Sequence, residues 1–174
     1  MPRPRQKEYT SFFSNYINLT KGKDYKELVK NHDKIICDFW AKIPSEKWGF
    51  SYMDGKWTIK QLFQHVIDTE RILAFRALSI ARKELNPLSS FDENEYAENG
   101  NAINRDPKSM IQEYIYLRKS TNYLYSSFNN CENKLIGKVI DKKISVNALG
   151  FIIIGHSLHH INICKKYYGL KLFN

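Results

Sequence analysis

The sequence predicts an all-α protein, a four-helix bundle with a long crossover between its second and third helices and a short N-terminal helical segment. Three observations support this prediction. Four long stretches carry apolar residues at helical spacing, and each begins at a capping residue and ends at a proline, a glycine or a polar turn. One polar link, longer than the others, separates the second stretch from the third. Strand signals are weak throughout.

The N-terminal part predicts a short helical segment followed by the first long helix. Residues 11–18 are rich in aromatic side chains, which suits a helix lying across the domain. Asp24 is a good N-cap for a helix over residues 24–42, which ends before Pro44. His32 falls on the polar side of this helix, so we expect it at the surface.

The second helix leads into the long link. Thr58 caps a helix over residues 59–83, which Asn86 and Pro87 close. Residues 84–106 then form a connection rich in Asn, Asp, Pro, Gly and Ser. A link of this length without secondary structure of its own is usually a crossover or a functional segment such as a lid.

The C-terminal part predicts the last two helices. Pro107 stands at the first position of a helix over residues 106–130. A polar, partly extended stretch follows at residues 133–143. A serine then caps the fourth helix, over residues 145–168, which stops at Gly169.

Length and composition bound the class of protein. A chain of 174 residues with 43% hydrophobic and 26% charged residues suits one folded domain, which we place at residues 1–174. No apolar run reaches the ~18 residues of a membrane span, and the basic N-terminus lacks the apolar core of a secretion signal. The 3 cysteines form no CxxC pair, as in reduced cytosolic proteins. The sequence therefore predicts a cytoplasmic protein with no membrane partner.

The net charge of +9 raises the question of a nucleic-acid partner. The lysines and arginines are scattered, and only those between Lys21 and Lys34 approach a stripe. No RNP, zinc-finger or helix-turn-helix signature accompanies them. A solvated basic surface is the better interpretation, and nucleic-acid binding is disfavoured.

Three histidines are candidate metal ligands. His156 and His160 are spaced i, i+4, so both project from one face of the fourth helix, and His65 lies on the second. The neighbours on these faces are mostly apolar, so we expect all three histidine side chains to face the interior of the bundle. Three imidazoles suit zinc, nickel, iron or copper and leave a coordination position open, as catalytic sites do. Alternatively, the HxxxH pair is incidental and these are core histidines, although three buried imidazoles are costly unless paired.

Two charged residues accompany His65 on the second helix. Asp68 lies one turn away, where it could bond an imidazole, line the pocket or face solvent. Arg76 lies three turns beyond His65 on the same inward face, so its guanidinium needs a carboxylate or a ligand anion. We expect Arg76 to form a structural ion pair rather than to bind a substrate. The candidate partners are Asp92, Glu93 and Glu113.

The opposite side of the fourth helix is apolar too, with Ile154, Leu158 and Ile161. A helix that is apolar on both faces is buried on both. Either the aromatic N-terminal segment or a second subunit covers this side, and we expect a homodimer.

Three segments together resemble a known family. YMDGKWTIKQLFQHVIDTERILAFRALSIAR, then PLSSFDENEY and GHSLHHINICKKYY, resemble the DinB-like superfamily of metal-binding four-helix proteins, and the resemblance covers about residues 9–168. It implies a bundle whose helix order differs from the simple up-down-up-down arrangement. It also implies a divalent ion, most often zinc or nickel, bound by one histidine of the second helix and two of the fourth. Matched to this chain, these are His65, His156 and His160.

The resemblance also bears on the reaction. Some members of that family resemble thiol S-transferases that use low-molecular-weight thiols such as bacillithiol or mycothiol, and a related one is an isomerase. A metal-dependent enzyme with a small-molecule substrate is therefore implied, and our preferred reaction is attack of a metal-activated thiolate on an electrophile. A metal-dependent hydrolase and a non-catalytic metal or small-molecule binding protein are the alternatives. Asp68 and Asp92 are the candidate catalytic residues.

Overall fold

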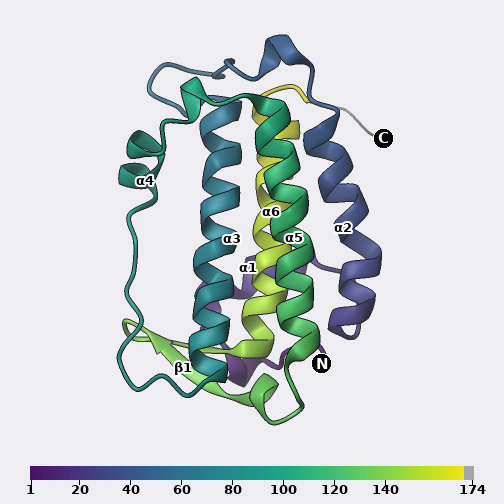
Figure 1. The fold of residues 1–174 in the computed structure, drawn as a ribbon, viewed down its shortest axis with the longest axis vertical. Coiled ribbons are helices and arrows are strands. Elements are labelled where there is room, and N and C mark those ends of the chain that lie inside the picture. The colour runs from purple at the N-terminus through teal and green to yellow at the C-terminus, as the bar shows by residue number, and fades with distance from the viewer. Residues whose placement is uncertain (171–174) are drawn as a thin grey trace.

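The computed structural model describes residues 1–170, in which four long helices lie side by side (Figure 1). They are α2 (Tyr25–Ala41), α3 (Ile59–Ala81), α5 (Pro107–Ser127) and α6 (Val146–Tyr167). α6 packs against α3 and α2, and α5 packs against the same two helices. The predicted all-α four-helix bundle is confirmed.

The long connection between α3 and α5 sets the order of the helices. The chain runs up α2, down α3, and back up beside the bundle before it runs down α5 and up α6 (Figure 1). α3 is therefore parallel to α5 and antiparallel to α6. The predicted crossover is present, and the helix order is not the simple up-down-up-down one.

The capping residues predicted for α2, α3 and α6 begin these helices, and Asp106 does the same for α5. Thr58 forms a capping box with Gln61 at the start of α3. The side chains of Asp24, Asp106 and Ser145 each accept a hydrogen bond from a backbone N–H in the first turn of α2, α5 and α6. These bonds satisfy backbone donors that a helix start leaves unpaired. The helix starts therefore follow from local sequence.

Two connections differ from the predictions. The link at residues 84–106 contains α4 (Glu93–Asn99), so part of it is helical. The stretch at residues 133–143 enters an antiparallel hairpin of β1 (Ile136–Val139) and β2 (Lys142–Ser145). Four-residue strands are too short to produce a clear alternating pattern, which is why the sequence did not predict them. Short 3-10 helices lie at Gln6–Glu8, Ser11–Phe13, Ser45–Lys47, Ala102–Asn104 and Glu132–Lys134.

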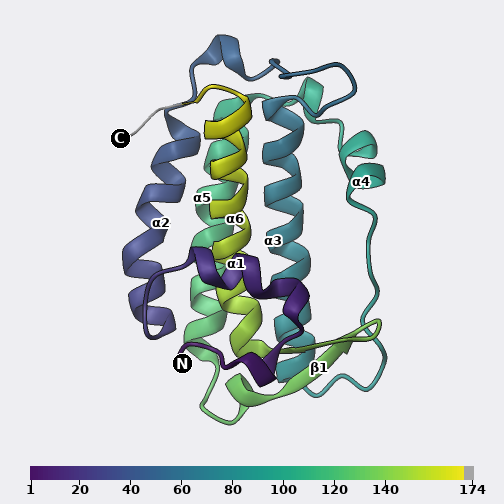
Figure 2. The ribbon, with the colours of Figure 1, turned by 180° about the vertical axis from the view of Figure 1, so that it is seen from behind.

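The N-terminal segment forms α1 (Ser14–Leu19), which crosses the outer side of α6 (Figure 2). Gly155 permits this close approach, because a Cβ atom there would collide with the backbone of Tyr16. Ile154 and Ile161 are buried as a result. The chain covers this apolar face itself, so the face gives no reason to expect a second subunit.

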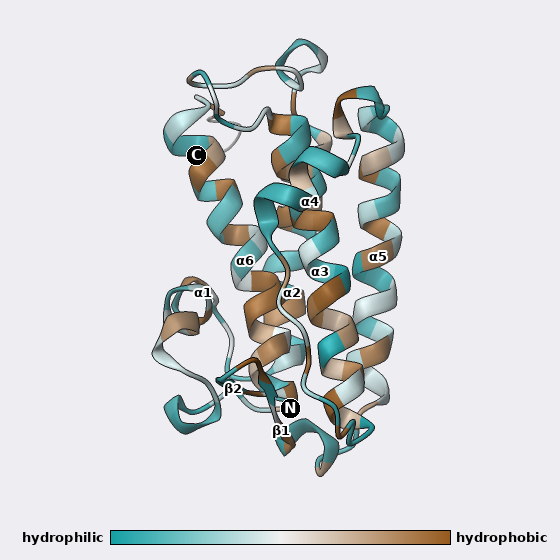
Figure 3. Ribbon diagram, turned by 90° about the vertical axis from the view of Figure 1, so that its left-hand side faces the viewer, coloured by the Kyte–Doolittle hydropathy of each residue, from teal (hydrophilic) through white to brown (hydrophobic). Residues whose placement is uncertain are grey.

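The apolar core is centred on α6. The N-terminal half of this helix is strongly hydrophobic (Figure 3), and its residues from Val146 to Ser157 are all buried. Within residues 1–170, no helix combines the length and the apolar character that crossing a membrane requires.

His32 is buried, contrary to the surface position predicted for it. It is 7% exposed, and its Nε2 atom accepts a hydrogen bond of 2.8 Å from the backbone N–H of Lys21. The chain that precedes α2 folds over this side of the helix. Helical spacing alone does not reveal such a covering segment.

The charged groups at the centre of the bundle are paired. Arg118 and Glu70 are each 2% exposed, and Nη1 of Arg118 donates a 2.8 Å hydrogen bond to Oε1 of Glu70. Nη2 donates to Asp33 at 2.9 Å, and Thr121 donates to Glu70 at 2.7 Å. This network joins α2, α3 and α5, and it offsets the cost of removing the charges from water.

Replacing Gly155 with alanine should push α1 away from α6. Overpacking costs about 1–3 kcal/mol, of which the better helix propensity of alanine offsets up to about 1 kcal/mol. We expect the free energy of unfolding in urea to fall by about 1–2 kcal/mol. Gly49→Ala is the matched control, since a Cβ there has no neighbour within 4 Å. Equal stability of the two variants would contradict the close packing of α1.

Candidate metal centre

Three imidazole rings meet between α3 and α6. His65 comes from α3, and His156 and His160 come from α6. The Nε2 atom of His156 lies 3.1 Å from Nε2 of His65 and 3.0 Å from Nε2 of His160. One ring nitrogen of each residue lies within 4.8 Å of the other two. The structure thus brings together the three histidines that the sequence singled out.

Helix geometry accounts for this convergence. His156 and His160 are four residues apart on α6, so their rings share one face, with centroids 4.4 Å apart. α3 packs antiparallel along that face and carries His65 inward. The ring centroid of His65 lies 4.9 Å from that of His156 and 4.8 Å from that of His160. No one helix could supply this triangle.

Hydrogen bonds among the rings cannot satisfy all of these contacts. A neutral imidazole has one N–H donor and one acceptor nitrogen, each with a single direction in the ring plane. Nε2 of His156 faces two other Nε2 atoms and can bond only one of them. A shared cation, by contrast, accepts a lone pair from all three. Nitrogen ligands about 2.0–2.1 Å from a zinc-type ion lie about 3.0–3.4 Å from each other, in agreement with the 3.0 and 3.1 Å observed.

Burial keeps these imidazoles uncharged. The three side chains are 7–8% exposed. Burial, with a smaller contribution from His159, lowers the pKa of His65 to about 4. Burial and the neighbouring histidines hold the pKa of His156 and of His160 well below the ordinary value. A metal ion needs neutral imidazole, so the donor atoms suit a divalent ion at neutral pH.

The Nδ1 atoms of the rings, which point away from the shared centre, have few polar partners. Nδ1 of His65 lies 3.5 Å from Oγ1 of Thr69, which is long for a hydrogen bond. Nδ1 of His160 is buried without a hydrogen-bond partner among the described residues. Aromatic packing supports the rings instead. The Trp57 ring lies 5.0 Å from that of His65, and the Tyr16 ring meets His156 edge-on at 5.6 Å.

A cavity of about 360 Å³ opens beside the three rings. It extends toward the β-hairpin, whose Val139 and Ile140 form part of its wall, and α4 contributes Glu93. His159, which the helical spacing places at the edge of the inner face, is half-buried and also lines it. The sequence did not assign the hairpin residues or Tyr16 to the site, because long-range packing brings them there. The aromatic wall consists of Phe12, Phe13, Tyr16, Trp57 and Phe91.

The two candidate catalytic acids lie outside this cavity. Asp68 accepts a 2.9 Å hydrogen bond from Gln64 and lines a separate hollow beside α4. Burial raises the pKa of the Asp68 carboxyl. Asp92 caps α4, where it accepts hydrogen bonds from the backbone N–H groups of Asn94 and Glu95. The structure therefore brings neither carboxylate to the three histidines.

Comparisons with known proteins bear on the family. Curated protein sequences gave no match. The solved structure of YfiT from Bacillus subtilis matches 98% of this chain and 91% of its own, with a TM-score of 0.69 and 16% sequence identity. That protein is described as a probable metal-dependent hydrolase with an unusual four-helix bundle topology. At this identity the likeness concerns the fold alone.

A family model gives the more specific result. The model of the DinB superfamily matches residues 36–164, a span that contains all three histidines. The chain therefore belongs to the DinB superfamily.

Proposed function

We propose that this protein is a metal-dependent enzyme whose divalent ion, zinc or nickel, is held by Nε2 of His65, His156 and His160. The observation that supports the proposal most is the convergence of three buried, uncharged imidazoles, in which Nε2 of His156 lies 3.1 and 3.0 Å from Nε2 of the other two, as metal ligands do. The description of YfiT as a probable metal-dependent hydrolase on the same fold supports it as well. Three protein ligands leave room for a substrate atom.

The reaction we propose is transfer of a small thiol to an electrophile. A bound divalent ion lowers the pKa of a thiol and so supplies a thiolate at neutral pH. The thiolate sulfur would bond to the electrophilic carbon as the leaving group departs with its bonding electrons, and the thiol proton would pass to solvent. The aromatic wall with Phe12, Tyr16 and Trp57 would hold an apolar electrophile and exclude water from the reacting atoms.

Hydrolysis is the second candidate, and the description of YfiT favours it. In this case water takes the place of the thiol. Asp68 and Asp92 lie outside the cavity, so neither reaction gives them a direct role. A protein that binds metal without catalysis is the remaining alternative. The free cysteines Cys37, Cys131 and Cys164 favour a reducing compartment such as the cytoplasm.

Removing one ligand should abolish tight metal binding. Loss of a residue that only supports a ligand costs about 10–100-fold in metal affinity, so His156→Ala should lower the affinity for zinc by at least about 100-fold. The measurement is competition with a chromophoric chelator, together with elemental analysis of the purified protein. His159→Ala is the matched control, and it should retain one equivalent of metal. Equal affinities of the two variants would refute the ligand assignment.

Two assays on the metal-loaded protein should separate the candidate reactions. Thiol transfer predicts metal-dependent conjugation of L-cysteine or 2-mercaptoethanol to monochlorobimane, with the rate at least about 100-fold lower in His156→Ala. Hydrolysis predicts metal-dependent cleavage of p-nitrophenyl acetate in the absence of thiol. Ester cleavage alone would reverse the order of the two proposals. If neither reaction depends on the metal across several thiols and esters, the binding protein is the better account.

A further inference from the structure

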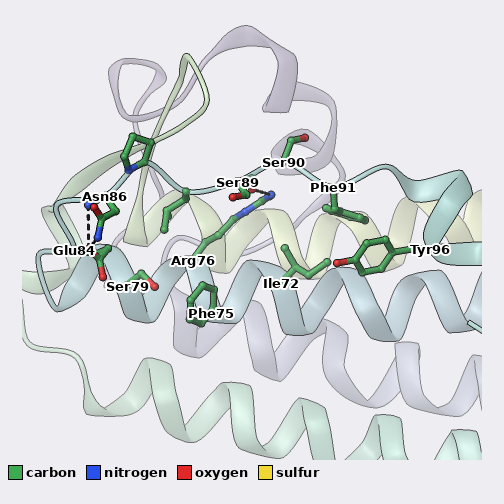
Figure 4. A pocket seen from close by; sticks show the side chains of 12 residues that line it. Ile72, Phe75, Arg76, Ser79, Glu84, Asn86, Ser89, Ser90, Phe91 and Tyr96 are labelled. Atoms are coloured by element: carbon green, nitrogen blue, oxygen red, sulfur yellow. Dashed lines mark hydrogen bonds between the residues drawn. The ribbon is translucent and has the colours of Figure 1, made fainter. Parts of the chain in front are cut away.

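Arg76 is a buried cation without a carboxylate partner. It lies on α3, three turns beyond His65, and is 8% exposed. Its Nη2 donates a 2.7 Å hydrogen bond to the carbonyl oxygen of Ser89, and its guanidinium lies 5.8 Å from the ring centroid of Phe91 (Figure 4). None of the ion pairs within residues 1–170 includes Arg76. The ion pair expected from the sequence is therefore not formed.

The three carboxylates expected to pair with Arg76 are engaged or lie apart from it. Glu113 binds Arg71 and Arg105. Asp92 caps α4, and Glu93 makes no hydrogen bond or ion pair with Arg76. Burial alone lowers the pKa of Arg76, as expected for a cation that no neighbouring carboxylate stabilises. A buried guanidinium with one carbonyl partner is costly, whereas Arg118 forms ion pairs with Glu70 and Asp33.

The guanidinium lies where two cavities meet. One is the cavity of about 360 Å³ that contains the three histidines. The other, of about 330 Å³, lies between α3 and the chain from Glu84 to Phe91 (Figure 4). Arg76, Ser90 and Phe91 line both. A ligand that reaches the histidines along α3 therefore passes within reach of Arg76.

The spacing along α3 sets the length of such a ligand. Eleven residues of helix separate His65 from Arg76, a rise of about 16 Å between their Cα atoms. Side chains on a helix lean toward its N-terminus, so the long Arg76 side chain reaches toward His65 while the shorter His65 side chain leans the same way. The distance left between the guanidinium and the ring nitrogens is on the order of 10–15 Å. The wall between them is mainly apolar, with Leu73 and Ile152.

We propose that Arg76 binds the carboxylate of the substrate, a monoanionic acid. Its apolar body spans on the order of 10–15 Å between the carboxylate and the group that reacts at the histidines. The statement that the other end of the substrate reacts at the histidines rests on the proposed function. The statement that Arg76 binds the carboxylate does not. The guanidinium fork matches a carboxylate in geometry. Arg76 supplies one positive charge at its end of the cavity, which suits a ligand group with a single negative charge there.

A purely structural role would leave most of the donors of Arg76 unexplained. The bond to Ser89 uses one of its five N–H groups. Nε and Nη1 bond no described residue, and neither is among the fully buried unpaired atoms. Each of them therefore keeps some exposure, on a residue that lines both cavities. The other cation in the lining, Lys142, is exposed and sits over the Phe12 ring at 3.6 Å, so it lies at the rim.

Calorimetric titration of the full-length protein with octanoate and with 1-octanol tests this proposal. The two probes share an apolar body and differ in charge. The wild type should bind octanoate about tenfold more tightly than octanol, or better. Arg76→Gln should remove this preference and leave octanol binding unchanged, while Arg76→Lys should keep part of it. Arg82→Gln is the matched control, because Arg82 carries the same charge on an exposed side chain that pairs with Glu132.

The outcomes distinguish this proposal from the metal site. Each titration is repeated after chelation of metal, and a preference that persists and depends on Arg76 supports the proposal even if no metal binds. A wild type that binds both probes equally overturns it, whether or not Arg76→Gln folds. A preference that survives in Arg76→Gln, or that disappears with the metal, also overturns it. Tighter binding of octyl phosphate than of octanoate would contradict the monoanionic class.

Discussion

The packing of α3 against α6 is the constraint on which the rest of the molecule depends. α6 is apolar around most of its circumference, so it must be covered on every side, and α3 supplies the side that carries the histidines. The register between the two helices then decides the site. A slip of one helical turn moves a residue by about 5.4 Å, which is more than the 3.1 Å between Nε2 of His65 on α3 and Nε2 of His156 on α6.

The buried polar groups of this fold fall into two sets, those that pair with each other and those that line a cavity. Glu70 and Arg118 form a buried ion pair, to which Thr121 adds a hydrogen bond, and this pairing contributes to the stability of the bundle. The three imidazoles and Arg76 are different, because they line one cavity, where a ligand can reach the bonding capacity that the protein does not use. Unused capacity of this kind is expected where a ligand completes the bonding. The contrast explains why the same α3 helix contains both structural and functional charges.

Much of this structure follows from local sequence, and the rest depends on contacts between distant segments. Capping residues such as Thr58 and Ser145 fixed the helix starts, and helical spacing showed that the three histidines face inward. The hairpin and α4 were not predicted, since short elements carry little periodic signal. The burial of His32 and the lack of a carboxylate at Arg76 were also missed. Both depend on chain that folds over a helix from elsewhere.

X-ray absorption spectroscopy of the zinc- or nickel-loaded protein tests the central claim most directly. If His65, His156 and His160 share one ion, the spectrum of the protein without added thiol should show three imidazole ligands at about 2.0–2.1 Å, with oxygen atoms from solvent as the remaining scatterers. Substituting His65 alone should reduce the imidazole count by one. A first shell with sulfur from the cysteines, or one that does not change when His65 is replaced, would contradict the account.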